Sequence, residues 1–313
     1  MVTENYDGGD LVLGTSGLVL SPKEFPHLTG LKGRTLLTSD GTTILGADDK
    51  AGIAEILTMI ERIQTENRPH GTICVAFTPD EEIGMGAEHF NLDQFGAEYA
   101  YTLDGDSEGE IQYENFNACK AEFEIRGFNV HPGEGKDTMI NASLVAIEIN
   151  NCLPSMETPR GTEDYEGFYH LISMQGEVGE AKLNYIVRDH DKNGFEERKK
   201  TLRLIEKNLN AKWGEGTVTL KITDQYLNMK EIVEEHIHLI DHAKKACEAA
   251  GVAPLILPIR GGTDGCQLSF KGLPCPNLGT GGHAFHGPYE HISVEGMEKS
   301  VELLLALIQE YTK

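Results

Sequence analysis

Apolar positions in the first third of the chain follow two different periods. Within residues 51–63 they recur at the spacing of one helical face, which predicts an amphipathic helix carrying Ile53, Ile56, Leu57, Ile60 and Ile63. Residues 71–77 form a nearly continuous apolar run, typical of a strand buried on both faces, and residues 99–103 form another. Strands that alternate with acidic turns and a helix indicate an α/β sheet, whose ligands gather beyond the carboxyl ends of its strands.

The residues before this helix predict loops and short strands up to about residue 32. A hairpin is expected next, because residues 35–38 and 43–45 are rich in apolar and β-branched residues and flank Asp40-Gly41.

The pattern changes near Cys119. The segments that follow alternate or show helical spacing in the order β-α-β-β-α-β, over residues 121–128, 141–153, 168–174, 182–188, 193–210 and 217–223. This order is that of a small split α+β domain. From about residue 231 the chain returns to helices and glycine-rich loops and ends in an apolar helix over residues 294–311.

We therefore predict an α/β fold with two domains. A catalytic domain, with a mixed sheet flanked by helices, comprises residues 1–116 and 227–313. An α+β domain comprising residues 117–226 is inserted into it. The length of 313 residues suits two domains better than one.

Composition narrows the class of protein. The formal net charge of -23 argues against binding to nucleic acid or to an anionic membrane surface. The six cysteines form no closely spaced pair, which indicates reduced thiols. No run of eighteen apolar residues and no leader-like N-terminus is present, so the sequence predicts a cytoplasmic protein.

Acidic or histidine-bearing segments follow several apolar runs and are candidates for a metal site. The candidate ligands and base are Asp48, Glu81, Glu82, Asp104 and His286. Each has an ordinary structural explanation: a helix N-cap for Asp48, solvated turns for the other acids, and a surface loop for His286. Together, carboxylates and an imidazole are the ligands that divalent cations prefer, and one of two adjacent glutamates is free to take a proton. The combination favours a two-metal hydrolase.

Three further residues are candidates for substrate binding. Arg188 ends a predicted strand and Arg260 lies in a glycine-rich loop, so both are explained equally well by surface salt bridges or by a grip on a substrate carboxylate. His131 precedes a proline and is either a turn residue or a donor to a developing oxyanion.

These motifs resemble a known family. In combination, residues 46–52, 78–84, 129–133, 260–265 and 286–290 resemble the zinc metallopeptidase family that includes carboxypeptidase G and succinyl-diaminopimelate desuccinylase. Within that family the chain is similar to the tripeptide aminopeptidases over essentially its whole length. The inserted domain then corresponds to the family's lid.

The resemblance implies a role for each candidate. Asp48 would bridge two zinc ions, Glu82 and His286 would hold one of them, and Asp104 would hold the other. Glu81 would be the general base. His131, Arg188 and Arg260 would bind the substrate. The resemblance also implies a cis peptide bond following Asp48, and pairing of two copies through the lid.

One departure concerns the family's first signature, a His-x-Asp at the end of an early strand. The only histidine before Asp48 is His27, which is followed by Leu28 and Thr29. The chain is therefore expected to be an N-terminally shortened member, in which the zinc held by Asp48 and Asp104 lacks its imidazole and binds weakly.

The sequence thus predicts a zinc-dependent aminopeptidase of peptide catabolism that releases the N-terminal residue of tripeptides. Its partner would be a short peptide substrate. Two alternatives stay open: a related metal-dependent amidase or dipeptidase, and a truncated remnant without catalytic activity.

Overall fold

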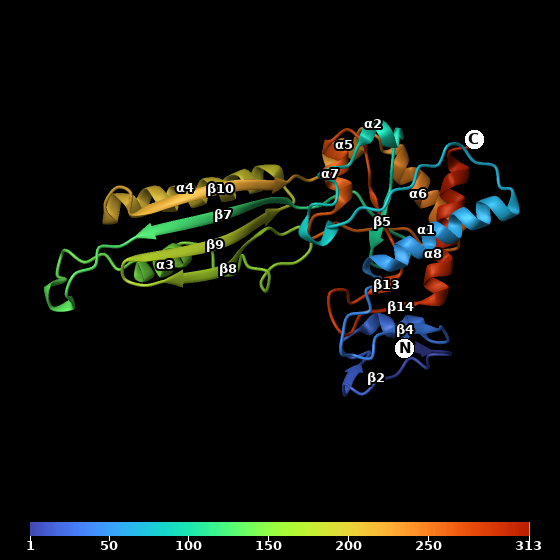
Figure 1. Cartoon of the computed structure of the whole chain (residues 1–313), viewed down its shortest axis with the longest axis horizontal. Helices are drawn as coiled ribbons and strands as arrows, with labels where there is room; N and C mark the ends of the chain where they lie inside the picture. The colour runs from blue at the N-terminus through green and yellow to red at the C-terminus, as the bar shows by residue number, and fades with distance from the viewer. Residues whose placement is uncertain (313) are drawn as a thin grey trace. The chain divides into compact units, whose positions relative to one another are not determined.

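The helix expected over residues 51–63 is present and extends beyond residue 63, while its first turn is irregular, because Asp48 and Asp49 have non-helical backbone angles. In the computed structural model, which describes residues 1–312, α1 spans Ala47–Glu66 and ends at Asn67, whose backbone is left-handed. The peptide bond between Asp48 and Asp49 is cis, as the family resemblance implied. Figure 1 traces the chain from the N-terminus to the C-terminus and labels its helices and most of its longer strands.

The chain forms two compact units. The first unit comprises Met1–Tyr113, Met229–Leu257 and the described residues from Thr263 on. The second unit comprises Glu114–Asn228 together with Pro258–Gly262. The sequence pattern gave no sign that the short segment Pro258–Gly262 packs with the second unit. The assignment of catalytic and lid roles to such units stays a prediction.

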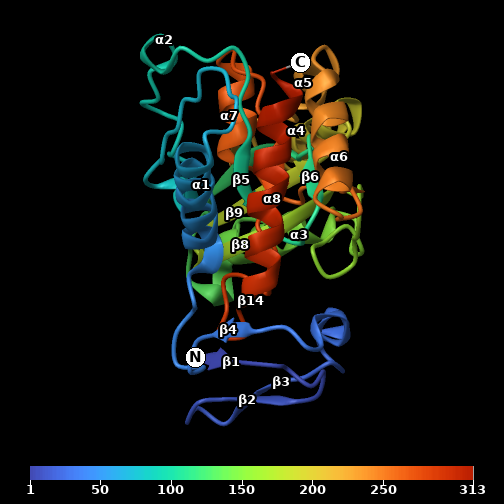
Figure 2. The same ribbon diagram turned by 90° about the vertical axis from the view of Figure 1, so that its right-hand side faces the viewer.

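The first unit contains a mixed four-stranded sheet in the order β11-β6-β12-β5. β12 runs parallel to β5 and antiparallel to β6, and β11 runs parallel to β6. The bounds are β5 Thr102–Gly105, β6 Glu110–Gln112, β11 Leu255–Ile256 and β12 Asn277–Gly279. The helices of this unit besides α1 are α2 Leu92–Phe95, α5 Lys230–Glu234, α6 His238–Ala249, α7 Asp264–Phe270 and α8 Val294–Glu310. Figure 2 shows α1, α8 and α6 side by side in front of β5 and β6.

A second sheet of the first unit is antiparallel and has the order β1-β4-β14-β13. Its strands are β1 Val2–Thr3, β4 Leu36–Thr38, β13 Gly282–His283 and β14 His291–Ser293, and a separate pair is formed by β2 Leu11–Leu13 and β3 Leu18–Leu20. A 3₁₀ turn, η1, spans Pro26–Leu31.

The prediction of a hairpin around Asp40-Gly41 is wrong. β4 pairs with β1 and β14, which are distant in sequence, and residues 43–45 form no strand. Local turn signals give way here to tertiary pairing, because two distant strands offer β4 a more extensive ladder than residues 43–45 do.

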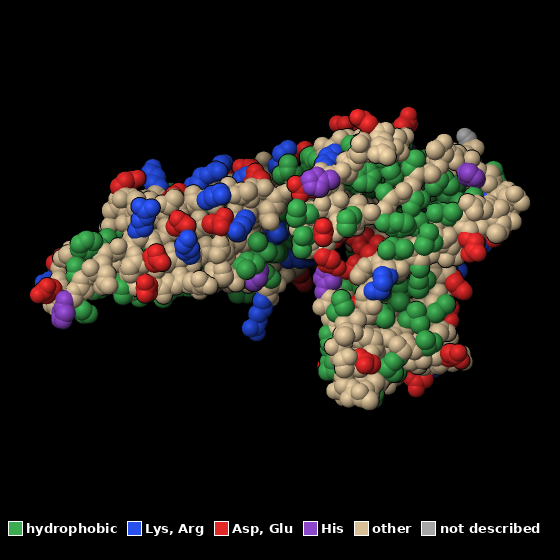
Figure 3. All heavy atoms as spheres, in the orientation of Figure 1, with side chains coloured by type: hydrophobic (Ala, Val, Ile, Leu, Met, Phe, Trp, Pro, Cys, Tyr) green, Lys and Arg blue, Asp and Glu red, His purple; other side chains and the backbone are tan. Residues whose placement is uncertain are grey.

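The prediction of a strand over residues 71–77 is also wrong. These residues have no strand assignment, and Val75 and Phe77 are 38% and 50% exposed. Ile53 and Leu57 of the predicted apolar face of α1 are exposed as well. Figure 3 shows hydrophobic side chains spread over the part of the first unit that carries these elements. A buried-strand pattern yields a strand only where neighbours cover both of its faces and complete its backbone ladder.

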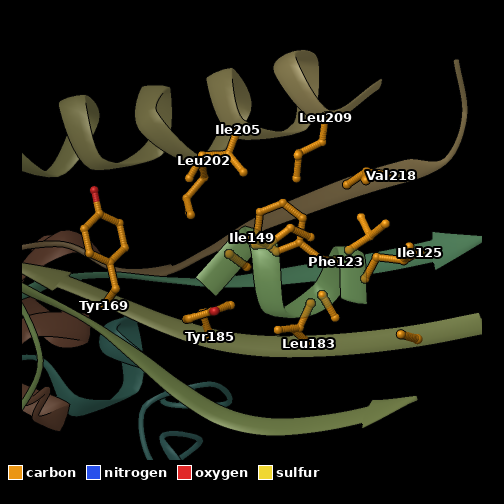
Figure 4. Packing of buried hydrophobic residues seen from close by; sticks show 14 of the residues in the cluster. Phe123, Ile125, Ile149, Tyr169, Leu183, Tyr185, Leu202, Ile205, Leu209 and Val218 are labelled. Carbon is orange, nitrogen blue, oxygen red and sulfur yellow. The ribbon is translucent and has the colours of Figure 1, made fainter. Parts of the chain in front are cut away.

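The second unit packs two helices against an antiparallel sheet in the order β10-β7-β9-β8. The elements are β7 Asn117–Arg126, α3 Ala142–Asn151, β8 Phe168–Gly176, β9 Glu180–Asp189, α4 Lys192–Trp213 and β10 Val218–Tyr226, with a 3₁₀ turn η3 at Pro132–Glu134. Inward-facing residues of the sheet meet the apolar faces of α3 and α4 (Figure 4). Phe123, Leu183 and Leu202 are fully buried in this core. The mixed α/β architecture follows the predicted class.

Three stacked imidazoles connect η1 to β13 and β14 in the first unit. The ring centroids of His27 and His283 are 4.1 Å apart, and those of His27 and His291 are 5.1 Å apart. His291 Nδ1 lies 2.7 Å from the carbonyl oxygen of Tyr289, so Nδ1 carries the proton and Nε2 accepts. His27 Nε2, at 2.9 Å, is then the donor to it. These hydrogen bonds require a neutral His291 ring, because its Nε2 must accept.

Acid should therefore weaken this histidine cluster. Burial lowers the pKa of His283 to about 3 and that of His291 to about 4, with neighbouring imidazoles and, for His283, Arg34 acting in the same direction, while Glu290 raises that of His291. Because the unfolded chain takes up these protons near pH 6.5 and the folded chain does not, the histidines cost stability progressively as pH falls from about 6.5 to 4.

We expect His283→Phe, which keeps a stacked ring without the charge, to gain stability relative to the natural chain over that interval, by on the order of 2 kcal/mol. Urea unfolding at several pH values measures this difference, with the exposed His70→Phe as the control. A constant difference between pH 7 and 4 would contradict the prediction.

Candidate metal centre

Asp48, Glu82 and His286 come together in the first unit from three separate parts of the sequence. His286 Nε2 lies 2.9 Å from Asp48 Oδ2 and 3.2 Å from Glu82 Oε2, and one ligand atom from each residue lies within 4.8 Å of the other two. Asp48 is partly buried, whereas Glu82 and His286 are exposed. These two carboxylates and one imidazole form a donor set suited to a divalent cation.

Glu290 fixes the backbone that carries Asp48. Its carboxylate accepts the backbone N–H of Gly46 at 2.6 Å and that of Asp48 at 3.0 Å, and the residue is 1% exposed. Glu290 lies only four residues after His286, so it holds the segments carrying two of the three clustered side chains in register. The sequence gives no sign of this role, since backbone hydrogen bonds across the fold leave no mark in a sequence pattern.

Asp104 joins the cluster through Asp48. It lies in β5, where Asn277 Oδ1 of β12 accepts its backbone N–H at 3.1 Å. Its carboxyl group hydrogen-bonds to the Asp48 side chain. Burial, and then the charges of neighbouring carboxylates, raise the pKa of Asp104. Such a bond between two carboxyl groups requires a shared proton, or in its place another positive charge.

Glu81 and Glu82 are adjacent in the 3₁₀ turn η2, Glu81–Ile83, but have different surroundings. Burial is the main cause that raises the pKa of Glu81 to about 7, followed by the charges of Asp264, Glu82 and Asp48. The backbone N–H of Asp264 donates to the Glu81 carboxylate and offsets part of this effect. Glu82 points a carboxylate oxygen at His286. The geometry thus separates a proton-accepting role from a ligand role within one turn.

The charge balance of the cluster fits a cation. Asp49 adds a further carboxyl group, whose pKa is raised to about 8 by burial first and by Asp48 and Glu81 next. Within residues 1–312, no Lys or Arg forms an ion pair with any carboxylate of this cluster, Asp48, Asp49, Glu81, Glu82 and Asp104. Partly buried carboxylates without a cationic side chain are stabilised either by protons or by a metal ion. These residues therefore fit a divalent metal.

His131 and Arg188 belong to the second unit. His131 is exposed, and its Nδ1 accepts the backbone N–H of Gly133 at 3.2 Å, so it caps η3. Arg188 of β9 donates to Gln225 Oε1 at 3.1 Å and lies 5.1 Å from the ring centroid of Tyr226. Burial lowers the pKa of its guanidinium group. Substrate binding by these residues stays a prediction.

Arg260, also in the second unit, donates to a loop of the same unit. Its Nη1 donates to the carbonyl oxygens of Asp164 at 2.6 Å and Glu166 at 3.1 Å, and its Nη2 to Thr162 Oγ1 at 3.0 Å. The guanidinium group also lies 5.1 Å from the ring centroid of Phe116. These acceptors are carbonyl and hydroxyl oxygens rather than the surface carboxylates of the ordinary explanation. Substrate binding by Arg260 stays a prediction.

A mixed α/β unit that gathers carboxylates and an imidazole around one point offers a candidate divalent-metal site of the kind that metal-dependent hydrolases use. Residues 41–310 match the family described as Peptidase family M20/M25/M40. The chain belongs to this family, and it is a peptidase.

Individual relatives agree with this assignment. The chain is 54% identical to peptidase T of Halothermothrix orenii over 99% of its own length and 76% of that protein. It is 55% identical to peptidase T of Clostridium perfringens over 100% of its length and 77% of that protein. The solved aminopeptidase PepT of Bacillus cereus is similar over 89% of this chain and 74% of that one, with a TM-score of 0.77 at 28% identity.

Residues 1–312 contain no helix that is both long and apolar enough to span a membrane.

Proposed function

We propose that the chain is a zinc-dependent aminopeptidase that removes the N-terminal residue of tripeptides. The observation that carries this proposal is the convergence of Asp48, Glu82 and His286, with Glu81 in the same turn as Glu82. The high identity to peptidase T supports the aminopeptidase type. We place the reaction in the cytoplasm, as part of peptide catabolism.

In this proposal Glu82 and His286 would hold one zinc ion, Asp104 would hold a second, and Asp48 would contribute its carboxylate to both. Bound zinc would supply an activated water molecule and polarise the scissile carbonyl group. Glu81 takes the proton of the attacking water and delivers it to the leaving amine. Burial keeps the Glu81 carboxyl group out of bulk water and raises its pKa above the ordinary value, which strengthens it as a proton acceptor.

The second unit would contribute substrate recognition. Arg188 and Arg260 would grip the free carboxylate of the peptide, and His131 would donate to the developing oxyanion. A grip at the C-terminus limits substrate length, because a longer peptide would overrun it. We also propose that two copies pair through the second unit, which light scattering of the purified chain tests.

Hydrolysis of a series of peptides tests the proposal. With zinc present, we expect Ala-Ala-Ala to be cleaved to alanine and Ala-Ala, and the dipeptide and tetrapeptide to be cleaved at least about tenfold more slowly in kcat/KM. Blocking the N-terminus of the tripeptide with an acetyl group should abolish cleavage. Preference for dipeptides or for acylated amino acids would instead indicate a related amidase or dipeptidase.

Metal stoichiometry of the purified chain separates the enzyme from a non-catalytic remnant. Two ions per chain favour the enzyme with both sites formed. Because Asp48 and Asp104 supply only carboxylates to the second ion, we expect that ion to bind more weakly than the one held by Glu82 and His286. No tightly held ion, together with no hydrolysis, would favour the remnant.

A further inference from the structure

The short helix α7 holds both ends of the segment that carries Glu81 and Glu82. At the start of the segment, Thr78 Oγ1 donates to Asp264 Oδ2 at 2.7 Å. At its end, Gln267 Nε2 donates to the carbonyl oxygen of Gly84 at 3.0 Å, and Lys271 Nζ donates to that of Glu88 at 2.7 Å. By contrast, residues 71–77 immediately before the segment form no strand. α7 and its C-cap residue Lys271 thus bind the segment at both ends, and between these ends Glu82 contacts His286.

Asp264 is the central residue of this attachment. It is 3% exposed, although it is a carboxylate, and its Oδ1 has no hydrogen-bond partner among the described residues. The backbone N–H of Asp264 donates to the Glu81 carboxylate. The side chain of Asp264 accepts hydrogen bonds from the Thr78 hydroxyl group and from the backbone N–H of Ala87. Asp264 therefore contacts the segment at three points: at Thr78 before Glu81, at Glu81 itself, and at Ala87 after it.

The close fit around Asp264 extends to Gly86. A Cβ atom at Gly86 would collide with the Asp264 carboxylate, so the chain passes directly against this side chain. Burying a carboxylate is costly, and among neutral alternatives an amide would accept the same hydrogen bonds more cheaply. A carboxylate at this buried position, within the electrostatic reach of Glu81, suggests a role beyond packing.

We propose that Asp264 is a positioning residue for the reaction, which holds Glu81 in the orientation needed to take a proton from water. This inference rests on the proposed role of Glu81 as the general base. It adds that the orientation of Glu81 is set by α7, through Thr78 and the turn over residues 80–86, and not by the segment before it.

A misplacement of about 1 Å in a reacting group costs up to about a hundredfold in rate, while substrate binding is unaffected. We therefore expect Asp264→Ala to lower kcat for the tripeptide about a hundredfold and to leave KM within about twofold. Asp264→Asn keeps an acceptor for Thr78 and should retain more activity than Asp264→Ala. Thr78→Val should lower kcat about tenfold, and Thr78→Ser, which keeps the hydroxyl group, should have the kcat of the natural chain. Asp93→Ala, an exposed carboxylate change in α2, is the matched control.

Two readouts do not depend on activity. Amide hydrogen exchange over residues 80–88 should become about tenfold faster in Asp264→Ala and Thr78→Val, while exchange in α6 and α8 is unchanged. Zinc affinity, measured by titration, should fall much less than kcat does, since of the three clustered ligands only Glu82 lies in this turn, while Asp48 and His286 lie on other segments. A uniform rise of exchange across the first unit would instead indicate general destabilisation and would overturn the proposal.

The outcomes separate this inference from the proposed function. If the natural chain cleaves the tripeptide and Asp264→Ala retains its kcat, the positioning role is wrong and the function stands. If a rise in KM accounts for the whole loss, Asp264 acts on substrate binding and the inference is again wrong. If the natural chain is inactive on peptides, the proposed function fails. Hydrogen exchange still tests the inference in that case: an unchanged exchange rate over residues 80–88 in Asp264→Ala would show that Asp264 does not hold the turn.

Discussion

Glu81→Ala should reduce turnover of the tripeptide by about two to four orders of magnitude and leave the metal content of the chain unchanged. The reason is geometric. Glu82 points a carboxylate oxygen to within 3.2 Å of His286 Nε2, whereas Glu81 lies outside the group of residues that share the candidate metal position. Removal of Glu81 therefore takes away the proton acceptor and spares the donor set.

Steady-state kinetics and metal analysis on the same preparation measure both parts of this prediction. Glu88→Ala, an exposed change in the same segment, serves as the control and should keep full activity. Glu81→Gln should lose as much activity as the alanine variant, because an amide fills the space but accepts no proton at neutral pH. Activity equal to that of the natural chain in either variant would remove Glu81 from its role.

The second prediction concerns His286, the only imidazole within the clustered donor set. We expect His286→Ala to weaken zinc binding by at least about a hundredfold and to abolish hydrolysis at micromolar zinc. The change removes a neutral nitrogen ligand and leaves Asp48 and Glu82 as the only members of the clustered donor set.

Competition with a chelator of known affinity gives the zinc dissociation constant of each variant. The exposed His89→Ala is the matched control, since it removes an imidazole from the same unit without touching the cluster. High zinc concentrations should restore part of the activity of His286→Ala, because the carboxylates remain in place. Unchanged zinc affinity in His286→Ala would show that the ion binds elsewhere.

Local sequence patterns predicted the elements whose neighbours are close along the chain. The amphipathic helices α1, α4 and α8 formed near their expected positions, since a helix completes its hydrogen bonds within its own segment. In the second unit, β7 and β9 alternate clearly between buried and exposed positions. Strict alternation specifies which face is buried, and so it also fixes the register of the pairing.

Chemistry-bearing motifs were equally visible, because adjacent acids after apolar runs stand out without knowledge of the fold. The sequence alone thus singled out Asp48, Glu82 and His286 as candidates. It could not reveal the residues that hold them. Glu290 and Asp264 act through hydrogen bonds to backbone atoms and to Thr78, in segments far apart in sequence.

The sequence by itself therefore determined the α/β class, the helices α1, α3, α4 and α8, and the identity of the acidic and histidine side chains at the centre. Only the tertiary structure decided that β4 pairs with β1 and β14, that residues 71–77 remain without a strand, and that Arg260 binds a loop of its own unit. The physical reason is the range of the interactions. A helix satisfies its backbone locally, whereas a strand, a buried carboxylate or a guanidinium group is satisfied only by partners that the rest of the fold brings to it.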